Sequence, residues 1–266
     1  MERFTWRILY DPPHGGALNM AVDEALLEET AAGHSLPTLR LYTWEPPTLS
    51  LGFAQPAADC DRDALSKMGW GLVRRPTGGR AILHTDELTY SITAPENHPL
   101  MQGGVLESYR RLSLGLLAGL RLLGVEVKAD AGERARAAKN PVCFEIPSQY
   151  EISAGGKKLI GSAQARRLGG VLQHGALPLH GDLARILQVL AKPDTAPERI
   201  HRRAATLGEL LGRDVSWQEA ADAIARGFSE TFEIDFRREE LTEREKTRAG
   251  ELAREKYGNE TWTIRM

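Results

Sequence analysis

The sequence predicts an α+β fold, because strand-like and helix-like segments follow one another without the regular alternation that a doubly wound parallel sheet needs. Strand-like runs gather in the first hundred residues and again after residue 150. Long segments with helical apolar periodicity lie between these runs and at the C-terminal end. The chain has 266 residues with 42% hydrophobic and 26% charged content, which is typical of a globular protein with a sizeable core.

Charge and cysteine content exclude several classes of protein. Lys and Arg number 34 against 36 Asp and Glu, and a net charge of -2 gives no global attraction to nucleic acid or an anionic membrane. The two cysteines, Cys60 and Cys143, fit neither a secreted disulfide framework nor a zinc pattern. The N-terminus has no apolar signal region, and no window reaches the length of a membrane span. We therefore expect a cytoplasmic protein with reduced thiols.

The first half of the chain is expected to alternate short strands with two helices. A helix should begin near Asn19, a good N-cap residue, with Asp23 and Glu24 placed early where the helix dipole favours acids. The other expected elements are a strand at 7–10, a turn at 11–16, strands at 38–42 and 48–52, a helix at 61–68, and strands at 72–75, 81–84 and 88–93.

The second half is expected to begin with a long helix at 106–123, whose leucines recur on one face and which Gly124 ends. Gly115 and Gly119 should let this helix lie close against a sheet. Residues 128–140 are charged and aperiodic, and we interpret them as a loop or loosely held helix. That this segment closes over the site is a hypothesis, based on its charge and its place next to Cys143. The remaining expected elements are strands at 151–153, 158–163 and 171–179, a turn at 155–156, a linker or surface excursion at 192–206, and capped helices beginning at Ser216 and Thr242.

The loop at 74–80, Arg-Arg-Pro-Thr-Gly-Gly-Arg, is the most unusual local sequence. Its glycines, Gly78 and Gly79, let a ligand approach the backbone, and Arg74, Arg75 and Arg80 suit a phosphate or carboxylate. These residues predict a cradle for an anionic or phosphopantetheine-bearing substrate. A glycine turn between two strands with solvated arginines explains the same residues about equally well.

Cys143 and Lys158 are candidates for covalent chemistry. A nucleophilic thiol needs partial exposure and a cationic neighbour, although a lone cysteine is more often a small buried hydrophobe. Lys158 precedes Gly-Ser-Ala at 161–163, where a substrate could lie against the backbone, and a buried lysine can lose its proton and act as a base. Cys60 is flanked by acids that would raise its pKa, so we interpret it as structural or incidental.

Two histidines, His84 and His174, lie in strand-like sequence. Either could orient a substrate or pair with a thiolate, but each is more often a structural histidine with satisfied hydrogen bonds. No metal-ligand spacing lies nearby, so the sequence predicts no metal site. Asp86 and Glu87 could pair with the arginines of the loop, although a solvated charge pair is the more common arrangement.

Four motifs together are more specific than any one of them. They are Asn-Met-Ala-Val-Asp-Glu-Ala at 19–25, Pro-Thr-Leu-Ser-Leu-Gly at 47–52 with Gln55, Arg-Arg-Pro-Thr-Gly-Gly at 74–79 with His84, and Lys-Leu-Ile-Gly-Ser-Ala at 158–163. In this order, over roughly residues 5–185, the chain resembles the lipoate–protein ligase A and octanoyltransferase superfamily. The resemblance implies a mixed sheet with flanking helices, of the biotin and lipoate protein ligase type. It also implies a single catalytic domain with a small helical extension over about 207–266.

Within the superfamily the chain is most similar to the ligase-like, cysteine-dependent octanoyltransferases. Cys143 stands fifteen positions before Lys158 in a Val-Cys-Phe-Glu context, and Arg80 stands where ATP-using ligases usually carry a third glycine. The resemblance implies that octanoyl-acyl carrier protein donates its acyl chain to Cys143, and that a lysine of a lipoyl domain then attacks the thioester. The implied acceptors are the glycine-cleavage H protein and dehydrogenase E2 subunits. No cofactor, nucleic acid or membrane is implied, and we expect a monomer.

The implied catalytic pair is Cys143 and Lys158, with Lys158 lowering the pKa of the thiol and later accepting the proton of the incoming amine. Backbone amides near Gly161 and Ser162, or near Gly78 and Gly79, would stabilise the oxyanion. The expected substrate-binding residues are Arg74, Arg75, Thr77, Gly78, Gly79, Arg80, His84, Gly161, Ser162 and Ala163.

Three other interpretations stay open at this point. An ATP-dependent lipoate–protein ligase would use the same loop and Lys158, but it would leave Cys143 without a role. A relayed amidotransferase would move octanoate between two carrier proteins by the same chemistry. A non-catalytic module that binds lipoyl or acyl-carrier domains would have an inert Cys143.

Overall fold

The computed structural model describes residues 3–130 and 151–266. Cys143 and most of the segment expected to close over the site lie outside these residues, so both expectations stay predictions. Among the described residues, no helix has the length and apolar character needed to cross a bilayer.

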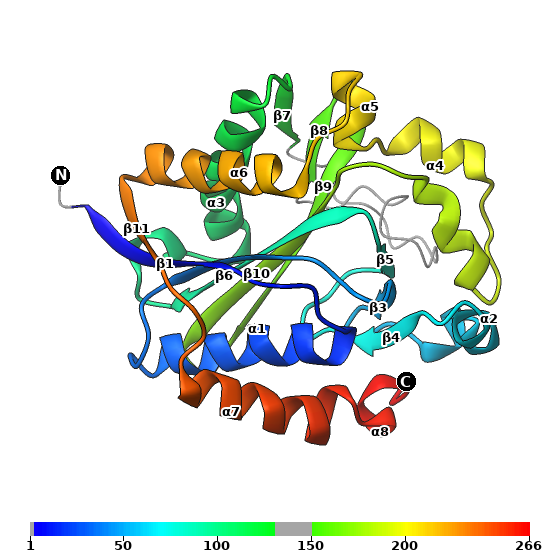
Figure 1. Ribbon diagram of the computed structural model, residues 1–266, viewed down its shortest axis with the longest axis horizontal. Helices are drawn as coiled ribbons and strands as arrows, with labels where there is room; N and C mark the ends of the chain where they lie inside the picture. The colour runs from blue at the N-terminus through cyan, green and yellow to red at the C-terminus, as the bar shows by residue number, and fades with distance from the viewer. Residues whose placement is uncertain (1–2, 131–150) are drawn as a thin grey trace.

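An eight-stranded mixed sheet runs through the centre of the molecule (Figure 1). Its strands are β1 (Phe4–Tyr10), β2 (Thr38–Tyr42), β6 (Glu87–Pro95), β7 (Val127–Asp130), β8 (Glu151–Ala154), β9 (Lys157–Arg167), β10 (Gly170–Pro178) and β11 (Ile234–Arg238). They lie in the order β11-β1-β2-β6-β10-β9-β8-β7. Neighbouring strands are antiparallel from β6 through β10, β9 and β8 to β7. Strand β1 instead pairs in parallel with both β2 and β11.

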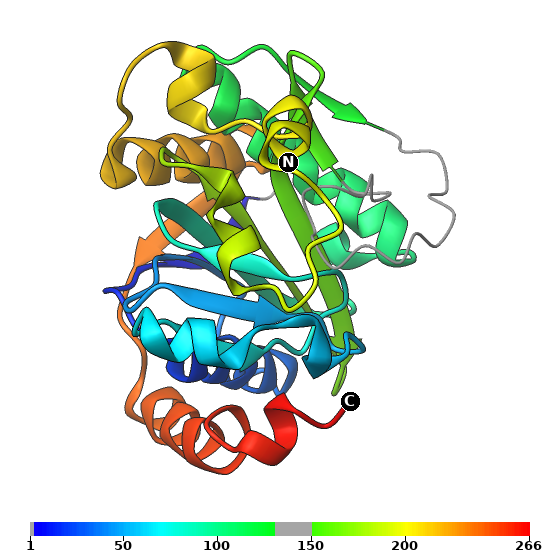
Figure 2. The same ribbon diagram turned by 90° about the vertical axis from the view of Figure 1, so that its right-hand side faces the viewer.

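A second, three-stranded sheet packs at one end of the large sheet (Figure 2). Its central strand β3 (Thr48–Leu51) pairs in parallel with β4 (Gly71–Arg74) and antiparallel with β5 (Ile82–His84). The loop predicted to hold a ligand connects β4 to β5, so it lies at the edge of this small sheet.

Helices cover both faces of the large sheet (Figure 1). One face carries α3 (Val105–Leu122) and α6 (Trp217–Phe232), and the other carries α1 (Gly16–Ala31) and α7 (Glu243–Leu252). The shorter helices are α2 (Arg62–Lys67), α4 (Pro197–Arg203), α5 (Leu207–Leu211) and α8 (Glu260–Thr263), with helical turns η1 (Ala57–Asp59), η2 (Pro99–Met101), η4 (Leu183–Val189) and η5 (Ala253–Tyr257). This arrangement confirms the predicted α+β class.

Helix α1 begins earlier than predicted. It starts at Gly16 after the N-cap residue Gly15, so Asn19 is an interior residue and the predicted N-cap was wrong. The Asn19 amide is buried and donates to the carbonyl oxygens of His14 and Thr43. Asp23 is also buried and lies beyond the first turn, so hydrogen bonds to other elements, rather than the helix dipole, explain its position.

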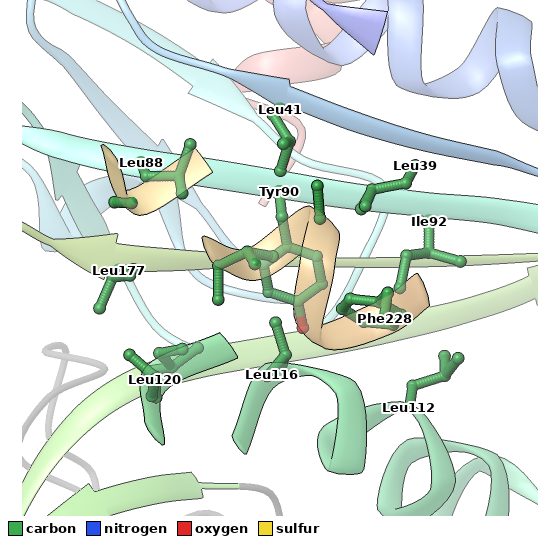
Figure 3. Packing of buried hydrophobic residues seen from close by; sticks show 14 of the residues in the cluster. Leu39, Leu41, Leu88, Tyr90, Ile92, Leu112, Leu116, Leu120, Leu177 and Phe228 are labelled. Carbon is green, nitrogen blue, oxygen red and sulfur yellow. The ribbon is translucent and has the colours of Figure 1, made fainter. Parts of the chain in front are cut away.

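The leucine stripe of α3 packs on the large sheet as predicted. Leu112, Leu116 and Leu120 are fully buried and face Tyr90 and other apolar residues of β6 (Figure 3). The predicted role of the helix glycines was wrong, because they face another helix and not the sheet.

A Cβ added at Gly115 would lie 2.8 Å from the Phe228 ring, and one added at Gly119 would lie 2.8 Å from the backbone of Ile224. Both of these neighbours belong to α6. The glycines therefore allow α3 and α6 to cross at close range.

The C-terminal region is joined to the N-terminal strand. Strand β11, which the sequence did not predict, extends the sheet beside β1. Arg7 on β1 donates two hydrogen bonds to Glu245 on α7, at 3.1 and 2.6 Å, and both side chains are buried.

Residues 192–206 are not merely a linker. They contain α4, and the Ala205 amide donates to the carbonyl oxygen of Lys158 at 3.0 Å. Ile200 and Ala204 are buried in the apolar cluster under the small sheet, which explains why the segment has a fixed path.

Candidate active site

A cavity lies between the two sheets, on the side of the large sheet that α1 covers. Its backbone wall comes from neighbouring residues of β9 and β10, and its apolar side chains come from α1, β2, β5 and the turn after β2. The lining residues are Met20, Tyr42, Trp44, Ser50, Arg75, Gly79, Ile82, His84, Thr89, Gly161, Ser162, Ala163, His174, Gly175 and Ala176. Six of the predicted substrate-binding residues are among them: Arg75, Gly79, His84, Gly161, Ser162 and Ala163.

The glycine loop is held in place by Arg75. This buried guanidinium donates to the carbonyl oxygens of Gly78 and Arg80 and to the carbonyl and hydroxyl oxygens of Ser50. Gly79 has a φ of 95°, which favours glycine, and its carbonyl oxygen would lie 2.0 Å from a Cβ added at Gly52. The loop therefore folds back against β3, and Arg75 fixes its shape.

Arg74 points away from the cavity. Its guanidinium is fully buried and donates to the carbonyl oxygens of Gly52, Phe53, Gln55 and Thr263. Arg74 does not line the cavity, so the predicted direct contact with a substrate gains no support there. Its hydrogen bonds tie the end of the small sheet to the C-terminal residues.

A buried relay connects the glycine loop to α1. The Thr77 hydroxyl lies 2.6 Å from His174 Nε2, and His174 Nδ1 lies 3.0 Å from Asp23 Oδ2. Burial lowers the pKa of His174, which favours the neutral ring. A neutral ring that donates from Nδ1 to Asp23 accepts at Nε2 from Thr77. The relay therefore fixes the orientation of the Thr77 side chain.

Asp23 is the anchor of this relay. Burial would raise its pKa, but hydrogen bonds from His174 and Ser91 and the charge of Arg40 lower it overall. Its two oxygens accept from Arg40, Tyr42, Ser91 and His174. Sequence reasoning placed Asp23 in a family motif but not in the site, because its partner His174 is 151 positions away.

His84 is the centre of a second network. Its Nε2 lies 2.8 Å from the Ser50 hydroxyl, and its Nδ1 lies 2.5 Å from Glu87 Oε1. The Trp44 ring stacks on His84 with centroids 3.9 Å apart. Sequence reasoning missed Ser50 and Trp44 as cavity residues, although both lie in or next to the motif at 47–52. The predicted solvation of Glu87 was wrong, because it is buried against His84.

Lys158 is a buried lysine with a carboxylate partner. Only 4% of its side chain is exposed, and its Nζ lies 2.7 Å from Glu151 Oε1 on the neighbouring strand β8. Gly161, which lines the cavity, follows three residues later on β9. Sequence reasoning identified Lys158 but not Glu151, since their pairing depends on the β8–β9 hairpin.

Ser162 lines the cavity, but its hydroxyl is bonded elsewhere. The Ser162 Oγ lies 2.7 Å from the hydroxyl of Tyr90, a residue of the core under α3. The predicted substrate contact of Ser162 would therefore come from its backbone atoms, as it would for Gly161 and Ala163.

An open groove adjoins the cavity and shares Gly79 with it. Its walls are residues 53–55, 76–80 and 164–167. Thr77, Gly78 and Arg80, the remaining predicted contact residues of the loop, line this groove. The charged residues of its lining are Arg80, Arg166 and Arg167. The loop thus lies between a largely apolar cavity and an open, positively charged groove that adjoins it.

The other chemical groups of the described residues lie apart from this site. Cys60 is buried, its thiol is 3.1 Å from the carbonyl oxygen of Ala57, and burial raises its pKa. A thiol in this state is a poor nucleophile. Among residues 3–130 and 151–266, no three His, Cys, Asp or Glu residues gather as metal ligands.

Comparison with known proteins identifies the family. Residues 16–229 match the lipoyl protein ligase A/B catalytic domain, and the chain belongs to this family. It is 45% identical, over 98% of its length and 99% of the relative, to the octanoyltransferase LipM of Carboxydothermus hydrogenoformans. It is also 45% identical, over the full length of both chains, to the octanoyltransferase LipM of Moorella thermoacetica.

Solved structures agree with this assignment. The chain is similar to Ta0514, a putative lipoate protein ligase from T. acidophilum with bound lipoic acid (TM-score 0.82, 31% identity, 99% of this chain and 100% of that one). It is also similar to a lipoate-protein ligase A bound with ATP (TM-score 0.81, 31% identity, 98% and 99% of the two chains). The predicted superfamily and fold are confirmed.

Proposed function

We propose that this protein is an octanoyltransferase, which moves an octanoyl group onto a lysine of a lipoyl domain in protein lipoylation. Full-length relatives at 45% identity carry this activity in their names. The observation that carries the proposal in the structure is the cavity between the sheets. Met20, Trp44 and Ile82 give it apolar walls, which suit a saturated acyl chain.

The polar side chains of the cavity are already bonded to protein partners. Ser50 and His84 bond to each other, His174 bonds to Thr77 and Asp23, and Arg75 bonds to the glycine loop. A neutral chain can therefore enter without leaving these buried groups unsatisfied.

The acyl group would pass through a thioester on Cys143. Its thiolate would attack the carbonyl carbon of the octanoyl thioester on a carrier protein, and the carrier would leave as a thiolate that takes a proton from the Lys158 ammonium. The lysine amine of the lipoyl domain would then attack the Cys143 thioester, form the amide and release the Cys143 thiolate. Thioester exchange is near balance and amide formation is downhill, so no ATP is needed.

Lys158 would serve both halves of this reaction. Its ammonium group, paired with Glu151, would stabilise the Cys143 thiolate and then protonate the leaving carrier thiolate. Lys158, now neutral, would accept the proton that the attacking amine loses, which restores the ammonium. Backbone amides at Gly161 and Ser162, or at Gly78 and Gly79, would bind the oxyanion.

The test is an intact mass after mixing the protein with octanoyl-acyl carrier protein without ATP. We expect a gain of one octanoyl group that hydroxylamine removes. The Cys143→Ala variant should show no adduct, whereas Cys60→Ala, the matched control, should be acylated like the original protein. Transfer to a lipoyl domain should follow ping-pong kinetics.

An adduct that persists in Cys143→Ala would overturn the assigned nucleophile. The similarity to a lipoate-protein ligase A bound with ATP supports a second candidate, an ATP-dependent ligase. That activity would appear as lipoyl-domain modification only when ATP and free lipoate or octanoate are supplied, with Cys143→Ala still active.

A further inference from the structure

Three arginines gather beside the groove, and each has buried guanidinium nitrogens without a hydrogen-bond acceptor, although Arg167 also interacts with Glu24 and Tyr257. Arg74 and Arg265 both donate to the carbonyl oxygen of Phe53, at 3.3 and 2.9 Å, so their guanidinium groups lie side by side. Arg167, at the end of β9, lines the same groove as Phe53. Arg74 NH2, Arg265 Nε, and Arg167 Nε and NH2 are buried nitrogens without a hydrogen-bond acceptor. We call Arg74, Arg167 and Arg265 the arginine cluster.

Two members of the cluster are partly exposed. The Arg167 side chain is 28% exposed, and Arg265 is half-buried between the rings of Phe53 and Trp262, at 4.0 and 3.9 Å. The stacking holds the Arg265 guanidinium in one plane beside the groove. Arg74 is fully buried and contributes positive charge behind them.

The carboxylates near the cluster have other partners. Glu24 lies 3.5 Å from Arg167 NH2, but both of its oxygens accept from Lys256, at 2.7 and 2.6 Å, and it also accepts from the Tyr257 hydroxyl. Asp59 accepts from the Gln55 side chain. The region therefore has an excess of positive charge, and mutual repulsion lowers the pKa of Arg74 and Arg265, after burial as the larger cause.

Unpaired guanidinium donors and an excess of positive charge are the chemistry that recognises a phosphate. The groove leads from the cavity past Gly79 to Arg167. A molecule whose acyl end fills the cavity can thus place a distant anionic end at the cluster.

We propose that the arginine cluster binds the phosphate of a phosphopantetheine arm on the acyl carrier protein, an inference that rests on the proposed use of a carrier-bound donor. Arg167 and Arg265 donate to the phosphate oxygens, and Arg74 adds its charge. This contact orients the donor thioester before transfer.

The test compares two small donors that differ only in the phosphate, octanoyl-pantetheine and octanoyl-phosphopantetheine. We expect the original protein to be acylated by the phosphorylated donor with a kcat/KM about tenfold or more higher. Arg167→Gln and Arg265→Gln should each reduce this preference towards unity, because kcat/KM falls more with octanoyl-phosphopantetheine than with octanoyl-pantetheine. Arg226→Gln, which removes an exposed charge on α6, is the control and should keep the preference.

Thermal unfolding must show that each variant is folded, and Arg167→Lys should retain part of the preference. Equal rates with the two donors in the original protein would overturn the proposal. So would variants that lose activity with octanoyl-acyl carrier protein but keep the preference between small donors, because the cluster would then bind the protein surface of the carrier.

Binding of unacylated phosphopantetheine, measured by calorimetry against pantetheine, tests the cluster without acyl transfer. Tighter binding of the phosphorylated compound, lost in Arg167→Gln, supports the anion site even if no octanoyl adduct forms. Failure of acylation with every donor would instead count against the proposed function, so the two failures are distinguishable.

Discussion

At the scale of single residues, the site consists of buried polar side chains that fix one another. Asp23 holds His174, which holds Thr77, and Glu87 holds His84, which holds Ser50. Each network joins a carboxylate on one element to a hydroxyl on another. Buried polar groups with complete hydrogen bonding favour one arrangement of the loop, since any other would leave a donor or acceptor unpaired.

The Lys158–Glu151 pair gives the first prediction at this scale. Glu151→Gln keeps the size of the side chain but removes the negative charge 2.7 Å from the lysine. The Lys158 side chain should lose the ion pair that holds its position. We expect kcat/KM for acylation to drop about tenfold or more, measured as the rate of mass gain with octanoyl-acyl carrier protein.

Glu151→Asp, which keeps the charge, should restore most of the rate. A Glu151→Gln variant that is acylated at the original rate would contradict this role of the carboxylate.

Thr77 gives a second prediction. Thr77→Val removes the hydroxyl 2.6 Å from His174 Nε2 and leaves that buried nitrogen without a donor. The glycine loop should lose its fixed orientation, and the rate of acylation should fall about tenfold, with a loss of about 1–3 kcal/mol in unfolding free energy. Thr77→Ser keeps the hydroxyl, and equal loss in both variants would contradict this role.

At the scale of elements, the close contact between α3 and α6 depends on small residues at facing positions of the two helices. Gly227 on α6 faces α3, and a Cβ added there would lie 2.3 Å from the amide nitrogen of Gly119. The helix itself is predictable from its apolar periodicity, as for α3. Which element each helix face packs against is not predictable from the sequence, because an apolar stripe fits a sheet and a helix equally well.

Gly227→Ala tests this crossing. Alanine favours a helix more than glycine does, yet the methyl group would push α3 and α6 apart, so we expect a net destabilisation of about 1–3 kcal/mol in chemical unfolding. Gly250→Ala on α7 is the matched control, because its Cβ would meet nothing closer than 3.8 Å. That variant should gain stability by about 0.5–1 kcal/mol. Equal effects at both sites would contradict the close crossing.

At the scale of the whole molecule, segments near the two ends of the chain pack against each other. Strand β11 lies beside β1, and the buried pair Arg7–Glu245 joins β1 to α7. Arg74 and Arg265 bring the small sheet together with the last residues at the carbonyl oxygen of Phe53. The C-terminal segment therefore shapes the groove.

The Arg7–Glu245 pair makes stability depend on pH. Burial would raise the pKa of Glu245, but hydrogen bonds from Arg7, Thr242 and Ser35 lower it overall. A carboxylate with a depressed folded-state pKa contributes its full stability above the unfolded-state pKa, about 4. This contribution is lost as the pH falls through the folded-state pKa.

Glu245→Gln should cost about 3–5 kcal/mol of unfolding free energy at neutral pH, because Arg7 stays buried without its partner. The loss of stability in acid should become shallower than in the original protein. Glu243→Gln, at an exposed position of the same helix, should change little. An unchanged acid dependence in Glu245→Gln would contradict the linkage.

The class of fold, the family, and most of the strands and helices near their observed bounds could be predicted from the sequence alone. Local periodicity, turn residues and four ordered motifs carry that information within short stretches of chain. The sequence also singled out the glycine loop and Lys158, because both stand inside such motifs.

The contacts of the side chains could not be predicted from the sequence and depend on the three-dimensional fold. Asp23 meets His174, Glu151 meets Lys158, and Arg74 turns from the predicted substrate to backbone carbonyls. These pairings join residues on different elements, and no local pattern specifies them. They follow from how the sheets and helices pack, since a buried charge must find its partner wherever the fold places one.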